Sequence, residues 1–132
     1  MTPRTHLAID RRLVGEPVAL VDGSASASLT TTAEMAADAR GLVHGGFVFG
    51  LADYAAMLAV NDPNVVLASS EARFLKPVQV GESLLAQAVV KEADGRKSRV
   101  QVEIQRGEEL VMTGTFVCYT LDRHVLDREE GR

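Results

Sequence analysis

The chain has 132 residues, of which 46% are hydrophobic and 24% are charged, and its formal net charge at pH 7 is −4. This length allows one domain with a hydrophobic core, and the composition is that of an ordinary globular protein. The acidic balance argues against a general nucleic-acid-binding protein, and a chain without Trp offers little surface for stacking bases. We therefore expect a single domain over residues 1–132 that binds no nucleic acid.

The sequence predicts neither a disulfide framework nor a membrane span. The single cysteine, Cys118, lies in the apolar run 115–121 and is interpreted as a buried, unreactive strand residue. Charged residues at Arg4 and at 10–12 exclude a signal-peptide pattern. The most apolar segment, 47–60, is shorter than the ~20 residues that a membrane span requires. We expect a cytoplasmic protein, and no cluster of Cys, His and acidic residues has the spacing of metal ligands.

Two strands joined by a tight turn are predicted near the N-terminus. The apolar run 18–21 ends in Asp22-Gly23, which is a strong signal for a two-residue hairpin turn. Every second residue from 25 to 29 is apolar, which is typical of a half-buried strand. Residues 31–43 are predicted to form a loop. His6 and His124 stand among charged residues and are interpreted as surface residues.

A long helix is predicted after the sequence His44-Gly45-Gly46. Residues 47–60 are apolar almost throughout, and a helix that is apolar on all sides is normally buried. The helix should begin at Gly45 or Gly46 and end near 61–63, where Asn, Asp and Pro are ordinary stop signals.

Asp53 is the one acidic or basic residue inside this helix. It lies nine positions after His44, which is about two and a half helical turns. A buried carboxylate costs free energy unless it is paired, hydrogen-bonded or used in chemistry. Asp53 is therefore the first candidate for a functional residue.

Four strand-like runs follow the helix, at 65–75, 83–93, 99–105 and 110–121. The order of a hairpin, one long buried helix and an antiparallel meander indicates an α+β architecture, in which an antiparallel β-sheet covers the helix. A single sheet leaves an edge open, and dimerisation closes an edge at little cost. We expect a homodimer, and a dimer of dimers is an open alternative.

With this pattern, the chain resembles the hotdog-fold acyl-CoA thioesterases, in particular the PaaI-like branch. The resemblance covers roughly residues 13–121, and its most specific parts are His44-Gly45-Gly46, Leu51-Ala52-Asp53 and the strand end 73–77 followed by Gly81-Glu82. It implies the hotdog fold, in which an antiparallel sheet wraps around one central helix and two protomers join their sheets.

The resemblance also implies roles for the residues at the helix start and for the helix acid. The backbone N–H of Gly45 would hold the thioester carbonyl oxygen, which suits the free N–H groups and the dipole of a helix N-terminus. Asp53 would be the general base or the nucleophile, in a site completed by the partner subunit. His44 would support the site, and Gly46 would let the substrate approach the backbone closely.

Two positions depart from the family or stay ambiguous. Many members carry Asn six residues before the His, where this chain has Asp38; two carboxylates could then face one pocket and titrate as a coupled pair.

Some members place Ser or Thr on the strand after the helix, which would be Ser69 or Ser70 here. A register change of one residue would exchange which of the two faces the site.

Four basic residues are candidates for contact with the phosphates of CoA: Arg73, Lys76, Arg96 and Lys97. The alternative for each is a solvated surface position. The implied substrate is an acyl-CoA or an acyl-carrier thioester with a small to medium acyl group, and no cofactor is expected because CoA is part of the substrate.

Two other functions fit parts of the same pattern. A non-catalytic acyl-CoA-binding protein, a sensor or a carrier, remains the alternative, although the presence of Asp53 favours catalysis. A hotdog hydratase or dehydratase is disfavoured because it needs a His near the Asp on the helix, and none follows Asp53 before His124.

Overall fold

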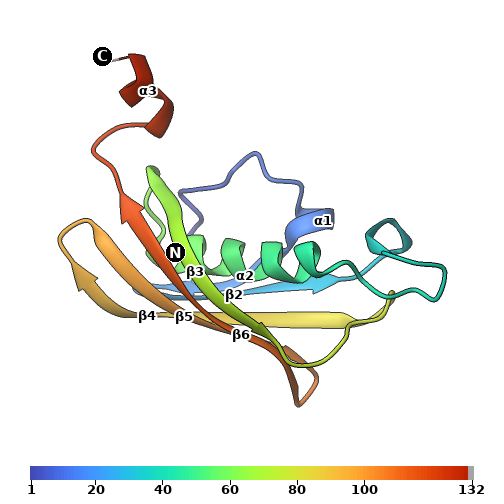
Figure 1. Cartoon of the computed structure of the whole chain (residues 1–132). Coiled ribbons are helices and arrows are strands. Elements are labelled where there is room, and N and C mark those ends of the chain that lie inside the picture. The colour runs from blue at the N-terminus through green and yellow to red at the C-terminus, as the bar shows by residue number, and fades with distance from the viewer. Residues whose placement is uncertain (131–132) are drawn as a thin grey trace.

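The computed structural model describes residues 1–130 and shows one antiparallel sheet that wraps around one long helix (Figure 1). The elements in chain order are α1 (Arg11–Val14), β1 (Glu16–Val21), β2 (Ser24–Thr30), the short 3₁₀ helix η1 (Ala33–Met35), α2 (Gly45–Val60), β3 (Val65–Phe74), β4 (Ser83–Asp94), β5 (Lys97–Arg106), β6 (Glu109–Thr120) and α3 (Val125–Glu130). This is the α+β architecture that the sequence predicted. None of the described helices has the length and hydropathy needed to cross a membrane.

Tight turns at glycine join neighbouring strands, as Asp22-Gly23 indicated for the first hairpin. Gly23 between β1 and β2 has φ +82°, and Gly95 between β4 and β5 has φ +61°. A side chain is strained at these angles, so glycine fixes where each hairpin turns. On β2 the alternate residues Ala25, Ala27 and Leu29 are buried, which confirms the predicted half-buried strand.

The place of β3 in the sheet does not follow the chain order. The strands lie in the order β1-β2-β4-β5-β6-β3, so β3 pairs with β6, the last strand, and forms one edge of the sheet. A bulge interrupts this pairing between Leu67 and Ser69, and Ala68 is the extra residue. The other edge of the sheet is β1.

α2 lies at the centre of the core, which explains why its sequence is apolar on nearly every side. Its large side chains, among them Leu51, Tyr54 and Leu58, are almost completely buried. Beyond the first turn, four residues keep partial exposure, and we call them the open stripe: Phe49, Gly50, Asp53 and Val60. At 3.6 residues per turn these four residues fall within an arc of roughly 100°.

Asn61 ends α2 and fastens the N-terminal segment to it. Its backbone is left-handed, with φ +51°, and its N–H donates to the carbonyl of Met57 at 2.8 Å. Its side-chain Oδ1 accepts from the N–H of Arg4 at 2.7 Å, and its Nδ2 donates to the carbonyl of Thr2 at 3.0 Å. The predicted helix end at 61–63 is confirmed, and its Asn has a second role that the sequence did not indicate.

His6 belongs to this N-terminal segment and is half-buried, so its interpretation as a surface residue is wrong. Its ring lies 6.2 Å from the ring of Tyr54, and its Nδ1 is 2.8 Å from the hydroxyl of Thr5. Burial lowers the pKa of His6. The error arose because the segment folds back onto α2, a contact that local charge patterning does not report. His124 is exposed, as predicted.

Replacing Asn61 by Ala should lower the free energy of unfolding by about 2–3 kcal/mol, because it removes two hydrogen bonds and forces Ala into a left-handed backbone. Asn61→Gly removes the same hydrogen bonds without that strain and should cost about 1 kcal/mol less. Urea unfolding of both variants measures the difference. Equal losses of unfolding free energy in the Ala and Gly variants would show that a side chain does not strain the left-handed backbone at this position.

Candidate functional site

Within the described chain, no side chain caps the start of α2. His44 is the N-cap residue, yet its side chain makes no capping hydrogen bond. Its exposed ring lies edge-on to Phe47, with 6.2 Å between the centroids. Gly45 and Gly46 are exposed as well. A helix N-terminus carries N–H groups without intrahelical partners and the positive end of the helix dipole, so this end can donate hydrogen bonds to a carbonyl or oxyanion.

Gly46 also has a packing role beside His44. A Cβ built on Gly46 would lie 3.0 Å from Nε2 of the His44 ring, a tight contact that the exposed imidazole would have to relieve by moving a few tenths of an ångström. The absence of a side chain therefore lets the imidazole lie close to the first helical turn.

The loop before α2 is held by hydrogen bonds on both sides. The N–H of His44 donates to the carbonyl of Met35 at 2.8 Å, and the N–H of Val43 donates to the carbonyl of Val78 at 2.8 Å. These bonds tie the N-cap residue to η1 and to the loop that follows β3. The position of the helix start is therefore fixed by two other segments of the fold.

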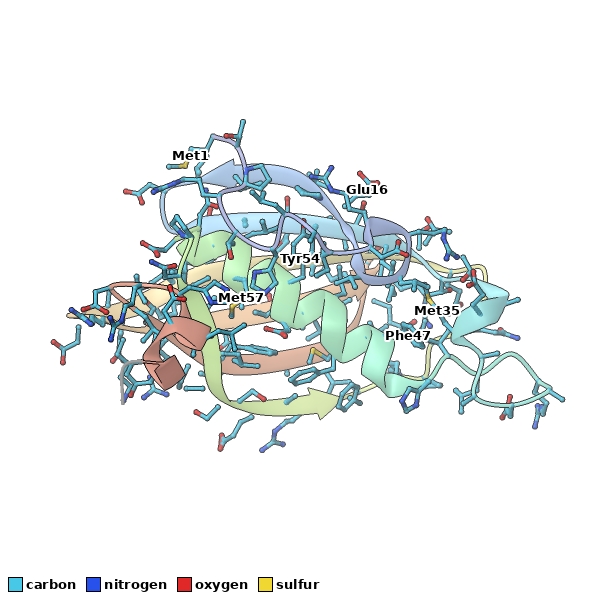
Figure 2. The ribbon with its side chains drawn as sticks, turned by 90° about the horizontal axis from the view of Figure 1, so that it is seen from above. Met1, Glu16, Met35, Phe47, Tyr54 and Met57 are labelled. Carbon is cyan, nitrogen blue, oxygen red and sulfur yellow. The ribbon has the colours of Figure 1, made fainter. Side chains whose placement is uncertain are left out.

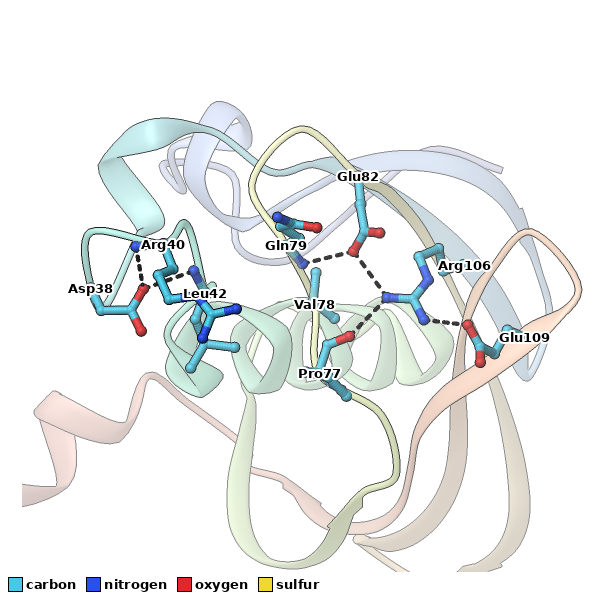
Figure 3. A pocket seen from close by; sticks show the side chains of 9 residues that line it. All are labelled: Asp38, Arg40, Leu42, Pro77, Val78, Gln79, Glu82, Arg106 and Glu109. Carbon is cyan, nitrogen blue, oxygen red and sulfur yellow. Dashed lines mark hydrogen bonds and ion pairs between the residues drawn. The ribbon is translucent and has the colours of Figure 1, made fainter.

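Arg106, at the end of β5, fixes the loop that follows β3 (Figure 3). Its guanidinium donates to the carbonyl of Pro77 at 2.8 Å and to the carboxylate of Glu82 at 2.9 Å, and it also bonds the carboxylate of Glu109. Arg106 is therefore engaged in structural contacts. It supports the helix start indirectly, through the loop that holds Val43.

Asp38 lies beside a surface hollow of about 640 Å³ and stabilises its own turn (Figure 3). Its Oδ1 accepts from the N–H of Arg40 at 3.0 Å and from the N–H of Leu42 at 3.2 Å. Burial is the cause that raises the pKa of Asp53, and within the described chain no neighbouring carboxylate adds to it. A coupled pair of Asp38 and Asp53 is therefore not formed inside one chain.

Asp53 is half-buried on α2, and its Oδ1 is buried with no hydrogen-bond partner in the described chain. Burial raises its pKa from 3.8 to about 6. Cys118, on the facing strand β6, is buried as predicted, and its pKa is raised to about 12 by burial and then by the charge of Asp53. The carboxylate thus lies between α2 and β6, with a proton affinity well above that of an ordinary Asp.

The pairing of β3 with β6 decides which serine faces α2. Ser70 lies opposite Phe116 and Ser69 lies opposite Val117. Phe116 points toward α2, since its ring lies 5.5 Å from that of Phe49. Directly opposite residues share a face of the sheet, so Ser70 faces the helix and Ser69 faces away.

Neither serine is level with Asp53. The β3 residue opposite Cys118, the neighbour of Asp53, is Leu67. The bulge at Ala68 separates Leu67 from the serines and keeps Leu67 on the face that Ser70 shares. Within one chain, Ser70 is therefore displaced from Asp53 toward the start of α2.

Arg73 and Lys76 lie at the end of β3 that is near the start of α2. Their neighbour Phe74 would be 3.8 Å from a Cβ built on Gly45. Arg73 pairs opposite Thr113 on the outer face of the sheet, and Lys76 lies 3.7 Å from Glu109. Both residues are exposed.

Arg96 and Lys97 lie at the other end of the sheet, at the turn between β4 and β5. Strand β5 is ten residues long, about 30 Å, and runs from Lys97 beside this turn to Arg106. Arg96 lies 3.7 Å from Asp122 and Lys97 is exposed. Within one chain, the two basic pairs that the sequence singled out therefore lie far apart.

Gly50 is a residue of the open stripe that the sequence analysis missed. A Cβ built on it would meet no atom of the described chain within 4 Å. A glycine inside a helix costs about 1 kcal/mol relative to alanine, and the described chain gives no steric reason for a glycine here. The presence of a glycine in the middle of the predicted helix was the signal in the sequence that could have singled it out.

The chain belongs to the thioesterase superfamily, whose family model matches residues 40–113. This range contains α2 with Asp53, the strands β3 to β5 and the last residues of the loop before α2. The predicted family is therefore confirmed.

Two solved structures illustrate the similarity. The uncharacterized protein PH1136 from Pyrococcus horikoshii is 54% identical, with a TM-score of 0.95, over 96% of this chain and 98% of that one. A mutant of the phenylacetic acid degradation protein PaaI from Thermus thermophilus is 29% identical, with a TM-score of 0.76, over 83% of this chain and 95% of that one. The second similarity confirms the resemblance to the PaaI-like branch.

Two curated relatives of this chain are not named as thioesterases. Methylthioribose-1-phosphate isomerase from Aquifex aeolicus is 52% identical over 88% of this chain, and the transcription factor FapR from Bacillus cereus is 33% identical over 68% of it. The chain spans 25% of the length of the first and 45% of the second. Each name describes a much longer protein.

The raised pKa of Asp53 predicts a pH-dependent stability. The folded protein binds the proton of the Asp53 carboxyl more tightly than the unfolded chain does. The free-energy cost of burying the ionised carboxylate is therefore absent below about pH 4 and complete above about pH 6. Asp53→Asn should therefore raise the free energy of unfolding at pH 8 by about 2 kcal/mol, allowing for partial exposure, and by little at pH 4. Urea unfolding at both pH values measures this.

The exposed variant Asp94→Asn is the matched control and should show no such gain at pH 8. A gain at pH 8 for Asp94→Asn equal to that of Asp53→Asn would contradict the assignment of the penalty to Asp53.

Proposed function

We propose that this protein hydrolyses an acyl thioester, of CoA or of an acyl carrier, to the free acid and the thiol. The observation that carries the proposal is the unpartnered, half-buried carboxylate of Asp53, with its pKa near 6, on a helix whose glycine N-terminus is uncapped. A general base is most effective when its pKa lies near the working pH. Membership of the thioesterase superfamily supports this use.

In the proposed reaction the N–H of Gly45 donates to the thioester carbonyl oxygen and stabilises the negative charge that develops on it. The carboxylate of Asp53 accepts a proton from water while the water oxygen bonds to the carbonyl carbon. The carbon–sulfur bond then breaks, and Asp53 returns the proton to the departing thiolate. The step consumes one water and needs no cofactor beyond the CoA portion of the substrate.

These two groups cannot serve one carbonyl inside a single chain. Gly45 and Asp53 are eight residues apart, which is about 12 Å along the helix axis. A thioester carbon and its attacking water occupy only a few ångströms. We therefore propose a homodimer in which Gly45 of one subunit acts with Asp53 of the other.

The alternative is a non-catalytic acyl-CoA-binding protein. The observation that favours it is the similarity to FapR, which is a transcription factor. Such a protein would bind an acyl-CoA without turnover and would not depend on the basicity of Asp53. A cytoplasmic location remains a prediction for both functions.

The test of the proposal is thiol release from a panel of acyl-CoAs of increasing chain length, with acyl-carrier thioesters alongside. Asp53→Asn and Asp53→Ala should lower kcat by about 10²–10⁴-fold in folded protein, because the base is removed. In the wild type, kcat/KM should rise with pH through an apparent pKa of about 6. Glu103→Gln, on the exposed outer side of β5, is the control and should keep wild-type activity.

Saturable binding of an acyl-CoA with no turnover would support the sensor or carrier instead. Turnover that survives both substitutions of Asp53 would remove it from the mechanism and make Asp38 the next carboxylate to replace.

A second variant removes the N–H of Gly45. Gly45 is the first residue of α2, where Pro is tolerated, and His44 already has the extended backbone that precedes Pro, with φ −60° and ψ 129°. Gly45→Pro should therefore keep the helix and lower kcat by about 10²–10³-fold. Steady-state kinetics measures the loss.

Gly45→Ala is the matched control, because it keeps the N–H and its Cβ would make an ordinary 3.8 Å contact with Phe74. Equal activities of the Pro and Ala variants would show that this N–H does not contact the reacting oxygen.

A further inference from the structure

A tight turn over residues 79–82 leads into β4, and Glu82 closes it. The N–H of Glu82 donates to the carbonyl of Gln79 at 3.1 Å, and its carboxylate accepts from the N–H of Gln79 at 2.7 Å. Gly81 has φ +93°, a backbone conformation that favours glycine in a turn. The pair Gly81-Glu82 stood out in the sequence, yet the proposed reaction uses neither residue.

Two other parts of the fold hold Glu82 in place. Thr31, which is buried directly after β2, donates from its N–H and from its hydroxyl to the carbonyl of Glu82, both at 3.0 Å. Arg106 donates to the carboxylate at 2.9 Å (Figure 3), and the side chains of Arg106 and Glu82 are only 23% and 32% exposed. Hydrogen bonds between charged groups are stronger than neutral ones, so this carboxylate ties the turn firmly to β5.

The turn continues into a segment that pairs with the entry to α2. The N–H of Val43 donates to the carbonyl of Val78, and the N–H of Val80 donates to the carbonyl of Gly41, each at 2.8 Å. These bonds form a short antiparallel ladder, so a displacement of one segment displaces the other. Gly45 follows Val43 by two residues, and the position of its N–H therefore depends on this ladder.

We infer that Glu82 is a positioning residue for the proposed reaction. Its carboxylate fixes the turn, the turn fixes the ladder, and the ladder sets the place of the Gly45 N–H. This inference deepens the proposed function and rests on it, because the N–H acts in catalysis only if it contacts the thioester oxygen. A group in an active site has to be held within roughly 0.5 Å of its productive position, and a shift of about 1 Å can lower the rate by about 10²-fold.

Replacing Glu82 by Ala releases the turn and should lower kcat and kcat/KM by the same factor, about 10–10²-fold, because the bond to the oxyanion forms in the transition state. The apparent pKa of the pH profile should stay at about 6, since Asp53 is unchanged. Glu82→Gln keeps an oxygen that accepts from the N–H of Gln79 and should stay within about threefold of wild type.

Circular dichroism checks that Glu82→Ala folds. If it does not, Glu82→Asp takes its place, because it shortens the reach of the carboxylate by one methylene and should give the same losses.

A double-mutant cycle with Gly45→Pro separates positioning from a general structural role. In a chain that already lacks the Gly45 N–H, the further loss from Glu82→Ala should be at most about twofold. A loss of the same size in both backgrounds, or no loss in the wild-type background, would overturn the inference.

The matched control is Glu109→Gln. Glu109 binds the same guanidinium of Arg106 but makes no hydrogen bond to the turn among the described residues, and Arg106 keeps its bonds to Pro77 and Glu82. This variant should therefore keep wild-type activity. A loss equal to that of Glu82→Ala would assign the effect to Arg106 and overturn the role of Glu82.

Amide hydrogen exchange tests the same inference without a substrate. In Glu82→Ala the N–H groups of Val43 and Val80 should exchange at least about tenfold faster than in wild type, while those of the central strand β5 keep their protection. Unchanged exchange at both positions would overturn the inference even in an active enzyme. Faster exchange in a protein that releases no thiol would contradict the proposed function and leave the control of the helix entry by Glu82 standing.

Discussion

The carboxylate of Asp53 is the feature on which the rest of this structure depends. It sits in the one helix that the whole sheet encloses, with a buried oxygen that has no partner within the described chain. Burial that raises a pKa from 3.8 to about 6 costs about 2 kcal/mol of folding free energy when partial exposure is allowed for, a large fraction of the stability of a small domain. The core around α2 offsets this cost, and the carboxylate keeps a proton affinity suited to chemistry near neutral pH.

The start of α2 holds the complementary group. The carboxylate of Asp53 accepts a proton, whereas the uncapped N–H groups at the start of α2 donate hydrogen bonds to an oxygen that carries negative charge. Because the two groups lie about 12 Å apart along one helix, the proposed reaction needs one group from each of two chains.

Much of the fold could be predicted because it is encoded locally. The Asp-Gly turns, the alternation along β2 and the bounds of α2 follow from backbone preferences and hydrophobic period. The position of β3 at the far edge and the bulge at Ala68 depend on long-range pairing, so the sequence left Ser69 and Ser70 undecided. The turn role of Asp38 and the fastening of the N-terminal segment by Asn61 are long-range or backbone contacts that composition does not report.

The most direct test of a site shared between two subunits is to mix two inactive variants, Gly45→Pro and Asp53→Asn, under conditions where subunits exchange. Each heterodimer would contain one intact site, built from Gly45 of one variant and Asp53 of the other. An equimolar mixture should therefore recover about a quarter of wild-type activity, because half of the randomly formed dimers are heterodimers with one working site of two. A mixture that stays as inactive as its components, although mass spectrometry shows that heterodimers have formed, would contradict the shared site.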